Sequence, residues 1–119
     1  MKFQKSIGFI IFISYLAIGN GCQYHKDLLP APGKDCPVVP PKYNNQVQAI
    51  IQIHCAIPQC HDAASTNIGG PFINYSLVKK KAQTIKIQVV NRFMPQGSSL
   101  NLDDIRTISC WVDSGAPEK

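Results

Sequence analysis

The sequence predicts an all-α domain of about three helices. Apolar residues recur at helical spacing in three separate segments, and the stretches between them are rich in glycine, proline and small polar residues, as loops are. The chain of 119 residues has room for one domain only and is small for a self-sufficient hydrophobic core. We therefore expect a covalently attached group or a disulfide to supplement the core.

Residues 1–21 have the pattern of a signal peptide. Lys2 and Lys5 precede an uncharged apolar run over 7–18, which is shorter than the ~20 residues that a membrane-spanning helix needs. The following Gly-Asn-Gly-Cys22 resembles a lipobox, in which the cysteine is acylated and becomes the mature N-terminus, although Gly19 departs from the usual Leu, Val or Ile. We predict export to the cell envelope (periplasm or outer membrane) with a lipid anchor at Cys22, and plain secretion is the alternative.

Residues 22–43 are predicted to form the lipidated N-terminus and an extended tether to a domain at 44–119. The segment shows almost no periodic apolar pattern, and His25 within it is expected to face solvent. It is rich in proline: Pro30, Pro32, Pro37, Pro40 and Pro41.

The first predicted helix covers 44–54, with Asn44 or Asn45 as its N-cap. It delivers Cys55 into a loop in which Pro58 prevents straightforward continuation of the helix. Its apolar stripe follows the spacing i, i+3, i+4 and i+7: Val47, Ile50, Ile51 and His54.

The second predicted helix begins at Ser76 and continues through 90. The β-branched run over 85–90 would also suit a strand, but the helical spacing that starts at Leu77 favours a helix. Lysines 79–81 fall mainly on the face opposite the apolar one. The apolar face consists of Leu77, Val78, Ala82, Ile85 and Val89.

The third predicted helix follows an irregular loop over 94–99 and has Asn101 as its N-cap. Asp103 and Asp104 lie in its first turn, where negative charge interacts favourably with the helix dipole, and Gly115 ends it. Its expected apolar face consists of Leu102, Ile105, Ile108 and Val112.

The segment Cys55-Ala-Ile-Pro-Gln-Cys60-His61 carries the clearest chemical signal. Two thiols that close a short loop can add across the haem vinyl groups as thioethers, and an imidazole beside the second thiol can ligate the iron. Four residues separate the cysteines here instead of the usual two, which is a less common variant. Met94, followed by Pro95, could supply a thioether to the opposite face of the iron. We predict one covalent haem c.

From about residue 50 to 117 the chain resembles the small single-haem cytochrome c domains of bacterial envelope proteins, particularly the wide-loop form of Bacteroidetes-type lipoproteins. The resemblance implies electron transfer, with His61 and Met94 as axial ligands of the iron. Residues 23–45 have no recognised counterpart. The matching parts are the helix ending in Cys55, Cys60-His61-Asp62, Phe72-Ile-Asn-Tyr75, Met94-Pro95 and the helix from Ile108 through Trp111 to Pro117.

The five cysteines can all be assigned. With Cys22 acylated and Cys55 and Cys60 on haem, Cys36 and Cys110 remain as a possible disulfide in an oxidising compartment. The alternative is that Cys55 bridges to Cys110 or Cys36, so that Cys60 alone holds the haem through a single thioether.

Two other classes of function stay open. One is a disulfide-stabilised surface lipoprotein that acts as a binding module without haem, or with a zinc site built from His54, Cys55, Cys60 and His61. The other is peroxidase-like activity with Met94 displaced from the iron. An ordinary enzyme is not expected, because the sequence shows no Ser/His/Asp arrangement, no usefully spaced carboxylate pair and no phosphate-binding glycine loop.

The formal net charge of +5 includes two signal-peptide lysines and is too weak to indicate nucleic-acid binding. The expected partners are redox proteins of the envelope and, through the lipid, a membrane. Lysines 79–81 are either a solvated helix face or a patch that steers an acidic redox partner. Trp111 and Tyr75 are expected to pack in the core or to contact haem, and Arg92 either pairs with a haem propionate or is solvated.

Overall fold

The computed structural model describes residues 35–119, which contain helices and no strand, so the all-α prediction is confirmed. None of these helices is long and apolar enough to cross a membrane. The predicted signal peptide, the lipidation site at Cys22, His25 and the tether up to residue 34 lie outside the described residues. The elements in chain order are the π-helical turn η2 (Tyr43–Val47) and the helices α1 (Gln48–His54), α2 (Tyr75–Lys80), α3 (Ala82–Val90) and α4 (Leu102–Asp113).

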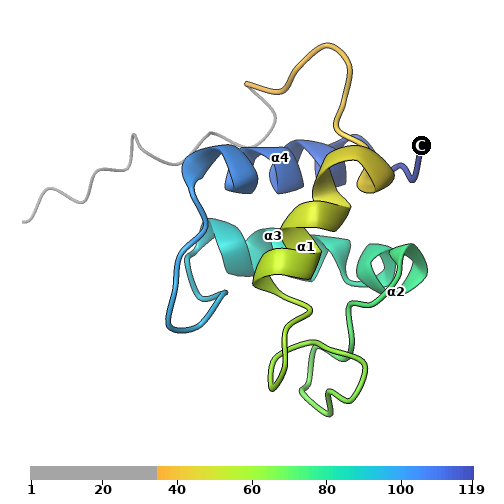
Figure 1. The fold of residues 1–119 in the computed structure, drawn as a ribbon. Helices are drawn as coiled ribbons and strands as arrows, with labels where there is room; N and C mark the ends of the chain where they lie inside the picture. The colour runs from red at the N-terminus through yellow and green to blue at the C-terminus, as the bar shows by residue number, and fades with distance from the viewer. Residues whose placement is uncertain (1–34) are drawn as a thin grey trace, which may run out of the picture.

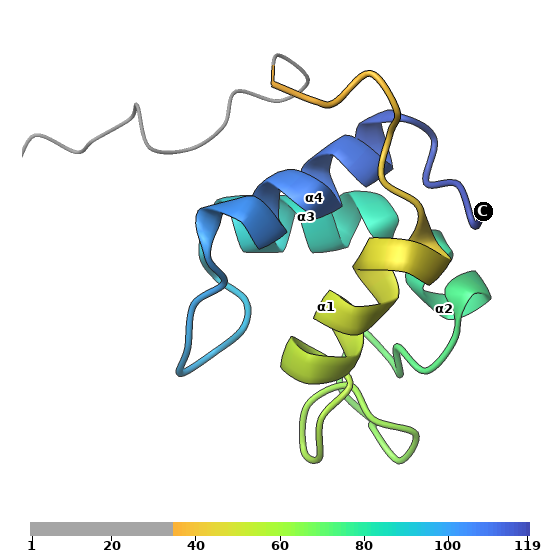
Figure 2. The ribbon, with the colours of Figure 1, turned by 45° about the horizontal axis from the view of Figure 1, so that its top comes forward.

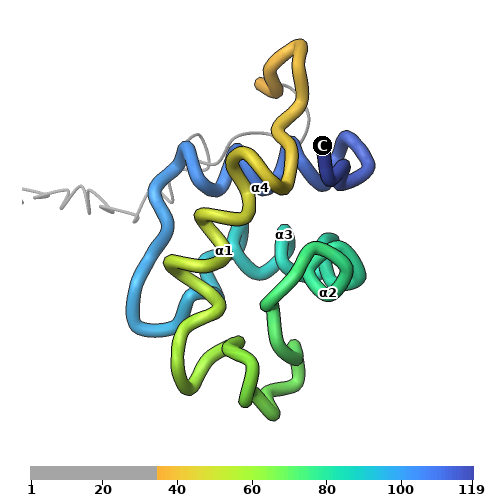
Figure 3. Tube along the Cα trace, turned by 45° about the vertical axis from the view of Figure 1, so that its right-hand side comes forward, coloured from red at the N-terminus to blue at the C-terminus, as the bar shows by residue number. Residues whose placement is uncertain are grey.

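The two long loops of the domain project to the same side of a helical layer. Helices α3 and α4 pack against each other, and α1 approaches them at a steep angle (Figures 1 and 2). The segment 55–74 leaves the end of α1, and the segment 91–101 leaves the end of α3; both extend away from α4 (Figures 1 and 3). Residues far apart in sequence are thereby brought to one region.

The start of the first helix differs from the prediction. Neither Asn44 nor Asn45 acts as the N-cap. Instead the backbone N–H groups of Tyr43 and Asn44 donate to the carbonyl oxygens of Pro117 and Glu118, at 3.0 and 3.1 Å. The free donors at a helix start need acceptors, and here the C-terminal tail supplies two of them, so no asparagine side chain is required.

The second predicted helix is two helices. It starts at Tyr75, with the Asn74 side chain accepting a hydrogen bond from the Leu77 backbone N–H (3.0 Å), and it is interrupted at Lys81, whose backbone has φ −108° and ψ 7°. The β-branched run belongs to α3, so the strand alternative is wrong. Val78 and Ile85 are buried as predicted, whereas Leu77 is only half-buried.

Helix α4 begins as predicted, because Asn101 Oδ1 accepts a hydrogen bond from the Asp104 backbone N–H at 2.8 Å. Gly115 follows the helix with φ +92°, a conformation that costs glycine little. Leu102 is exposed, in contrast to the prediction. The buried face consists of Ile105, Ile108, Ser109, Cys110, Trp111 and Val112.

Aromatic residues fix the C-terminal tail against the helices. Trp111 is fully buried and its indole N–H donates to the carbonyl oxygen of Pro117 (2.9 Å), while the Tyr75 hydroxyl donates to that of Ala116 (2.9 Å). The Tyr43 ring lies 5.3 Å from the Tyr75 ring and 6.1 Å from the Trp111 ring, between centroids. These contacts agree with the packing interpretation of Trp111 and Tyr75.

The structure contains the predicted disulfide between Cys36 and Cys110, with a Cα–Cα distance of 5.4 Å. It ties the segment that precedes the first helix to the C-terminal part of α4. Cys55 and Cys60 are both free thiols, so the alternative in which Cys55 pairs with Cys36 or Cys110 is wrong.

Candidate functional site

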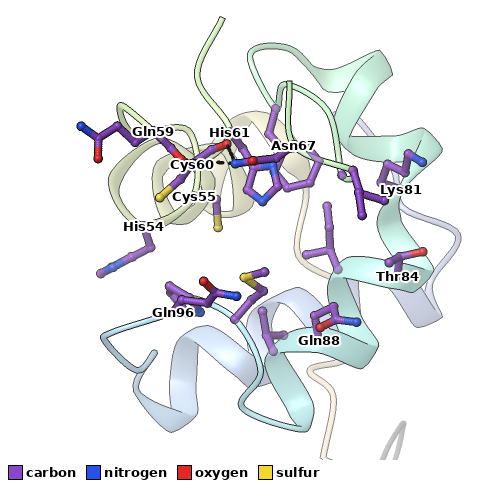
Figure 4. A pocket seen from close by; sticks show the side chains of 17 residues that line it. His54, Cys55, Gln59, Cys60, His61, Asn67, Lys81, Thr84, Gln88 and Gln96 are labelled. Carbon is purple, nitrogen blue, oxygen red and sulfur yellow. Dashed lines mark hydrogen bonds between the residues drawn. The ribbon is translucent and has the colours of Figure 1, made fainter. Parts of the chain in front are cut away.

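A cavity of about 340 Å³ lies beneath the two long loops, against α1 and α3 (Figure 4). Its volume is within the ~300–1,000 Å³ of small-molecule and cofactor pockets. Cys55, Cys60, His61 and Met94, the residues predicted to hold haem, all line it. Its deeper wall includes apolar side chains such as Phe72, Ile85 and Val89, all buried.

The His61 ring is held in one orientation. Its Nδ1 lies 2.8 Å from the carbonyl oxygen of Gly70, and the ring stacks on Phe72 with centroids 4.2 Å apart and planes inclined by 19°. A carbonyl oxygen can only accept, so Nδ1 carries the proton and donates. In the neutral ring Nε2 is then the nitrogen with a free lone pair, which is the arrangement that suits a metal-ligating histidine.

Glycine at position 69 allows the chain to pass close to the His61 ring. A Cβ atom on Gly69 would lie 2.7 Å from His61 Cε1 and 3.2 Å from its Nδ1, so a larger residue would displace the ring. Gly70 adopts φ +75° and presents its carbonyl oxygen to Nδ1. The sequence indicated only a glycine-rich and proline-rich loop between predicted helices, and the role of Gly69 and Gly70 in holding His61 was missed.

Hydrogen bonds close the loop between the two cysteines. The His61 backbone N–H donates to the carbonyl oxygen of Cys55 at 3.0 Å. The Ser65 hydroxyl and the Asn67 side-chain amide both donate to the carbonyl oxygen of Cys60, at 2.5 and 2.6 Å. The wide loop is therefore a built structure that presents both thiols to the cavity. Ser65 and Asn67 had no signal in the sequence beyond loop composition.

The two thiols differ in environment. Cys55 is 8% exposed, and its burial, together with the nearby Cys60, raises the pKa of its thiol to about 11. Cys60 is half-buried. Because only the thiolate is a good nucleophile, Cys55 is held in its unreactive form at neutral pH.

We predict that iodoacetamide modifies Cys60 before Cys55 in the folded, haem-free protein. With a pKa near 11, only about one Cys55 in a thousand is a thiolate at pH 8, and the reaction rate should rise about tenfold per pH unit up to pH 10. Mass mapping of labelled peptides over time measures both rates. In urea, where the burial is lost, Cys55 should react as fast as an ordinary thiol; equal rates in the folded protein would contradict the prediction.

Met94 reaches the cavity from the loop that folds back over the end of α3. The backbone N–H groups of Phe93 and Met94 donate to the carbonyl oxygen of Gln88, at 2.9 and 3.3 Å. The Met94-Pro95 peptide bond is cis. Arg92 adopts φ +58° and its guanidinium donates to the carbonyl oxygen of Leu100 (3.0 Å), across the base of the loop.

The remaining predicted site residues divide into two groups. His54 lines the cavity, whereas Arg92, Tyr75 and Trp111 do not. Within residues 35–119, no three His, Cys, Asp or Glu side chains are placed to hold a metal ion, so the zinc alternative lacks a ligand cluster there.

The three consecutive lysines do not share one environment. Lys79 lies over the Tyr75 ring, with its Nζ 5.3 Å from the centroid, and Lys80 is exposed. Lys81 is half-buried and lines the cavity. The prediction of a solvated lysine face therefore fits Lys79 and Lys80, which are both exposed, but not Lys81.

Comparisons of the chain with protein-family models, curated proteins and solved structures found no match. The functional assignment therefore depends on the cavity and the residues that line it.

Proposed function

We propose that the protein is an exported electron carrier that holds one haem c in this cavity. Cys55 and Cys60 would attach the haem through thioethers, and His61 and Met94 would ligate its iron. The observation that supports this most directly is that all four residues line a single cavity, although Met94 belongs to a loop remote in sequence from the other three.

The residues that line the cavity have the chemistry that a covalently bound haem requires. Both thiols are free, as thioether formation requires, and the Gly70 carbonyl leaves Nε2 of His61 as the available ligand nitrogen. Phe72, Ile85 and Val89 give the cavity an apolar interior that suits the tetrapyrrole plate. The disulfide accounts for the other two cysteines of the described residues, and it is also compatible with a haem-free binding module.

When bound, haem supplies a one-electron redox couple. Gly70 and Phe72 orient His61. The apolar wall would help to exclude water from the haem, and the Met94 thioether would favour the reduced iron and so raise the reduction potential. Because His61 and Met94 would both ligate the iron, we expect no substrate to bind to it. Outer-sphere electron transfer to redox proteins of the cell envelope is the reaction that remains.

A pyridine haemochrome spectrum tests the proposal. The protein, produced together with haem-attachment machinery, should be red and carry one haem per chain, and Cys60→Ala or His61→Ala should lose most of it. His54→Ala is the matched control, because it also removes an imidazole from the cavity wall but should retain the haem. A colourless wild-type protein with both thiols free would reject the proposal and favour the haem-free binding module.

A further inference from the structure

The charge around the cavity is unevenly distributed. Among the side chains of residues 35–119 that line it, Lys81 is the only lysine or arginine, and no aspartate or glutamate is present. Thr84 and Gln88 line the same wall, since they follow Lys81 at i+3 and i+7 along α3 and so share one helix face. One wall thus offers an ammonium, a hydroxyl and an amide to a ligand.

The break between α2 and α3 sets Lys81 apart from its neighbours. Lys81 ends one helix and begins the next, with non-helical backbone angles. Its side chain is half-buried at the cavity, whereas Lys80, adjacent in sequence, is exposed. A half-buried ammonium beside an apolar cavity is stabilised when an anion lies next to it.

Lys81 and Thr84 lie across the cavity from the two thiols. In Figure 4, Cys55 and Cys60 occupy one side, Lys81 and Thr84 the other, and His61 lies between them. In haem, the two vinyl groups and the two propionates lie toward opposite edges of the ring. A haem attached through its vinyl groups at the cysteines would therefore direct its carboxylates toward Lys81.

We propose that Lys81, assisted by Thr84, binds the haem propionates and fixes the rotation of the ring in the cavity. This inference depends on the proposed function, since it concerns the same ligand. It replaces the sequence-based suggestion that Arg92 pairs with a propionate, because the Arg92 guanidinium is engaged by the Leu100 carbonyl and does not line the cavity. Lys81 is a positioning residue that does not touch the iron.

The test uses the full-length, haem-free chain titrated with haem and with haem dimethyl ester, in which both carboxylates are blocked. Absorbance changes on binding give the two affinities. The wild type should bind haem about tenfold more tightly than the ester, as expected for one charge-assisted hydrogen bond. Lys81→Gln should remove this preference by weakening haem binding alone. Lys80→Gln makes the same charge change one residue away and should keep the preference.

Two results would overturn the inference, and they are distinguishable. If the wild type binds haem and its ester equally, or if Lys81→Gln keeps the wild-type preference, propionate recognition by Lys81 is wrong while the proposed function stands. If the wild type binds neither compound, the proposed function fails and this inference fails with it.

Discussion

Replacing Met94 by alanine in the haem-loaded protein is expected to abolish the weak ferric charge-transfer band near the red edge of the visible spectrum. The band reports sulfur ligation, and Met94 is the thioether that lines the cavity. The reduction potential should fall, because the ligand that favours ferrous iron is gone. The haem itself should stay attached, since Cys55 and Cys60 are unchanged. Spectroscopy and a redox titration measure these effects.

The loss should also open the iron to added imidazole or cyanide. Phe93→Ala is the matched control, because Phe93 precedes Met94, is 64% exposed and does not line the cavity. It should keep the wild-type band and potential. If the wild type itself lacked the band, and Met94→Ala left the spectrum and potential unchanged, the sixth ligand would have to come from elsewhere, and His54 on the cavity wall would be the first candidate, giving a lower-potential bis-histidine haem.

The elements that the sequence predicted correctly depend on local interactions. The Asn101 side chain caps α4 by accepting a hydrogen bond from the Asp104 backbone N–H, three residues further along the chain. Such a cap can be recognised from neighbouring residues in the sequence. The start of the first helix depends instead on Pro117 and Glu118, which are near it only in the folded chain. The break at Lys81 was also missed, because the buried residues Val78, Ala82, Ile85 and Val89 keep a helical spacing across it.

The same distinction applies to the candidate site. The spacing of Cys55, Cys60 and His61 identifies a chemical unit within one loop, so the sequence could predict it. Gly69 contacts the His61 ring only because the chain doubles back, and Lys81 reaches the cavity only because the helix breaks there. Arg92 has the charge to bind a propionate, but its side chain is held by a hydrogen bond to the carbonyl oxygen of Leu100, eight residues further along the chain.

Removing the disulfide should have the largest effect on stability. Cys36 and Cys110 are separated by 74 residues, and the loop between them contains η2 and α1 to α3. In the chain-entropy model, opening a loop of this length lowers the free energy of unfolding by about 4 kcal/mol, because the unfolded chain gains freedom. For a small domain this is a large part of a total of ~5–15 kcal/mol. The free energy of unfolding is measured by urea denaturation, with circular dichroism as the probe.

Two forms of the protein separate the cross-link from the packing of the cysteines. Reduced wild-type protein keeps both sulfur atoms. The decrease in its free energy of unfolding relative to the oxidised form therefore measures the effect of the cross-link alone. In Cys36→Ala/Cys110→Ala the buried Cys110 side chain is also cut back, so this variant should be less stable still, by the cost of a small cavity. If oxidised and reduced wild type unfolded at the same urea concentration, the disulfide would not stabilise the domain, and the helices would have to hold together through their apolar core alone.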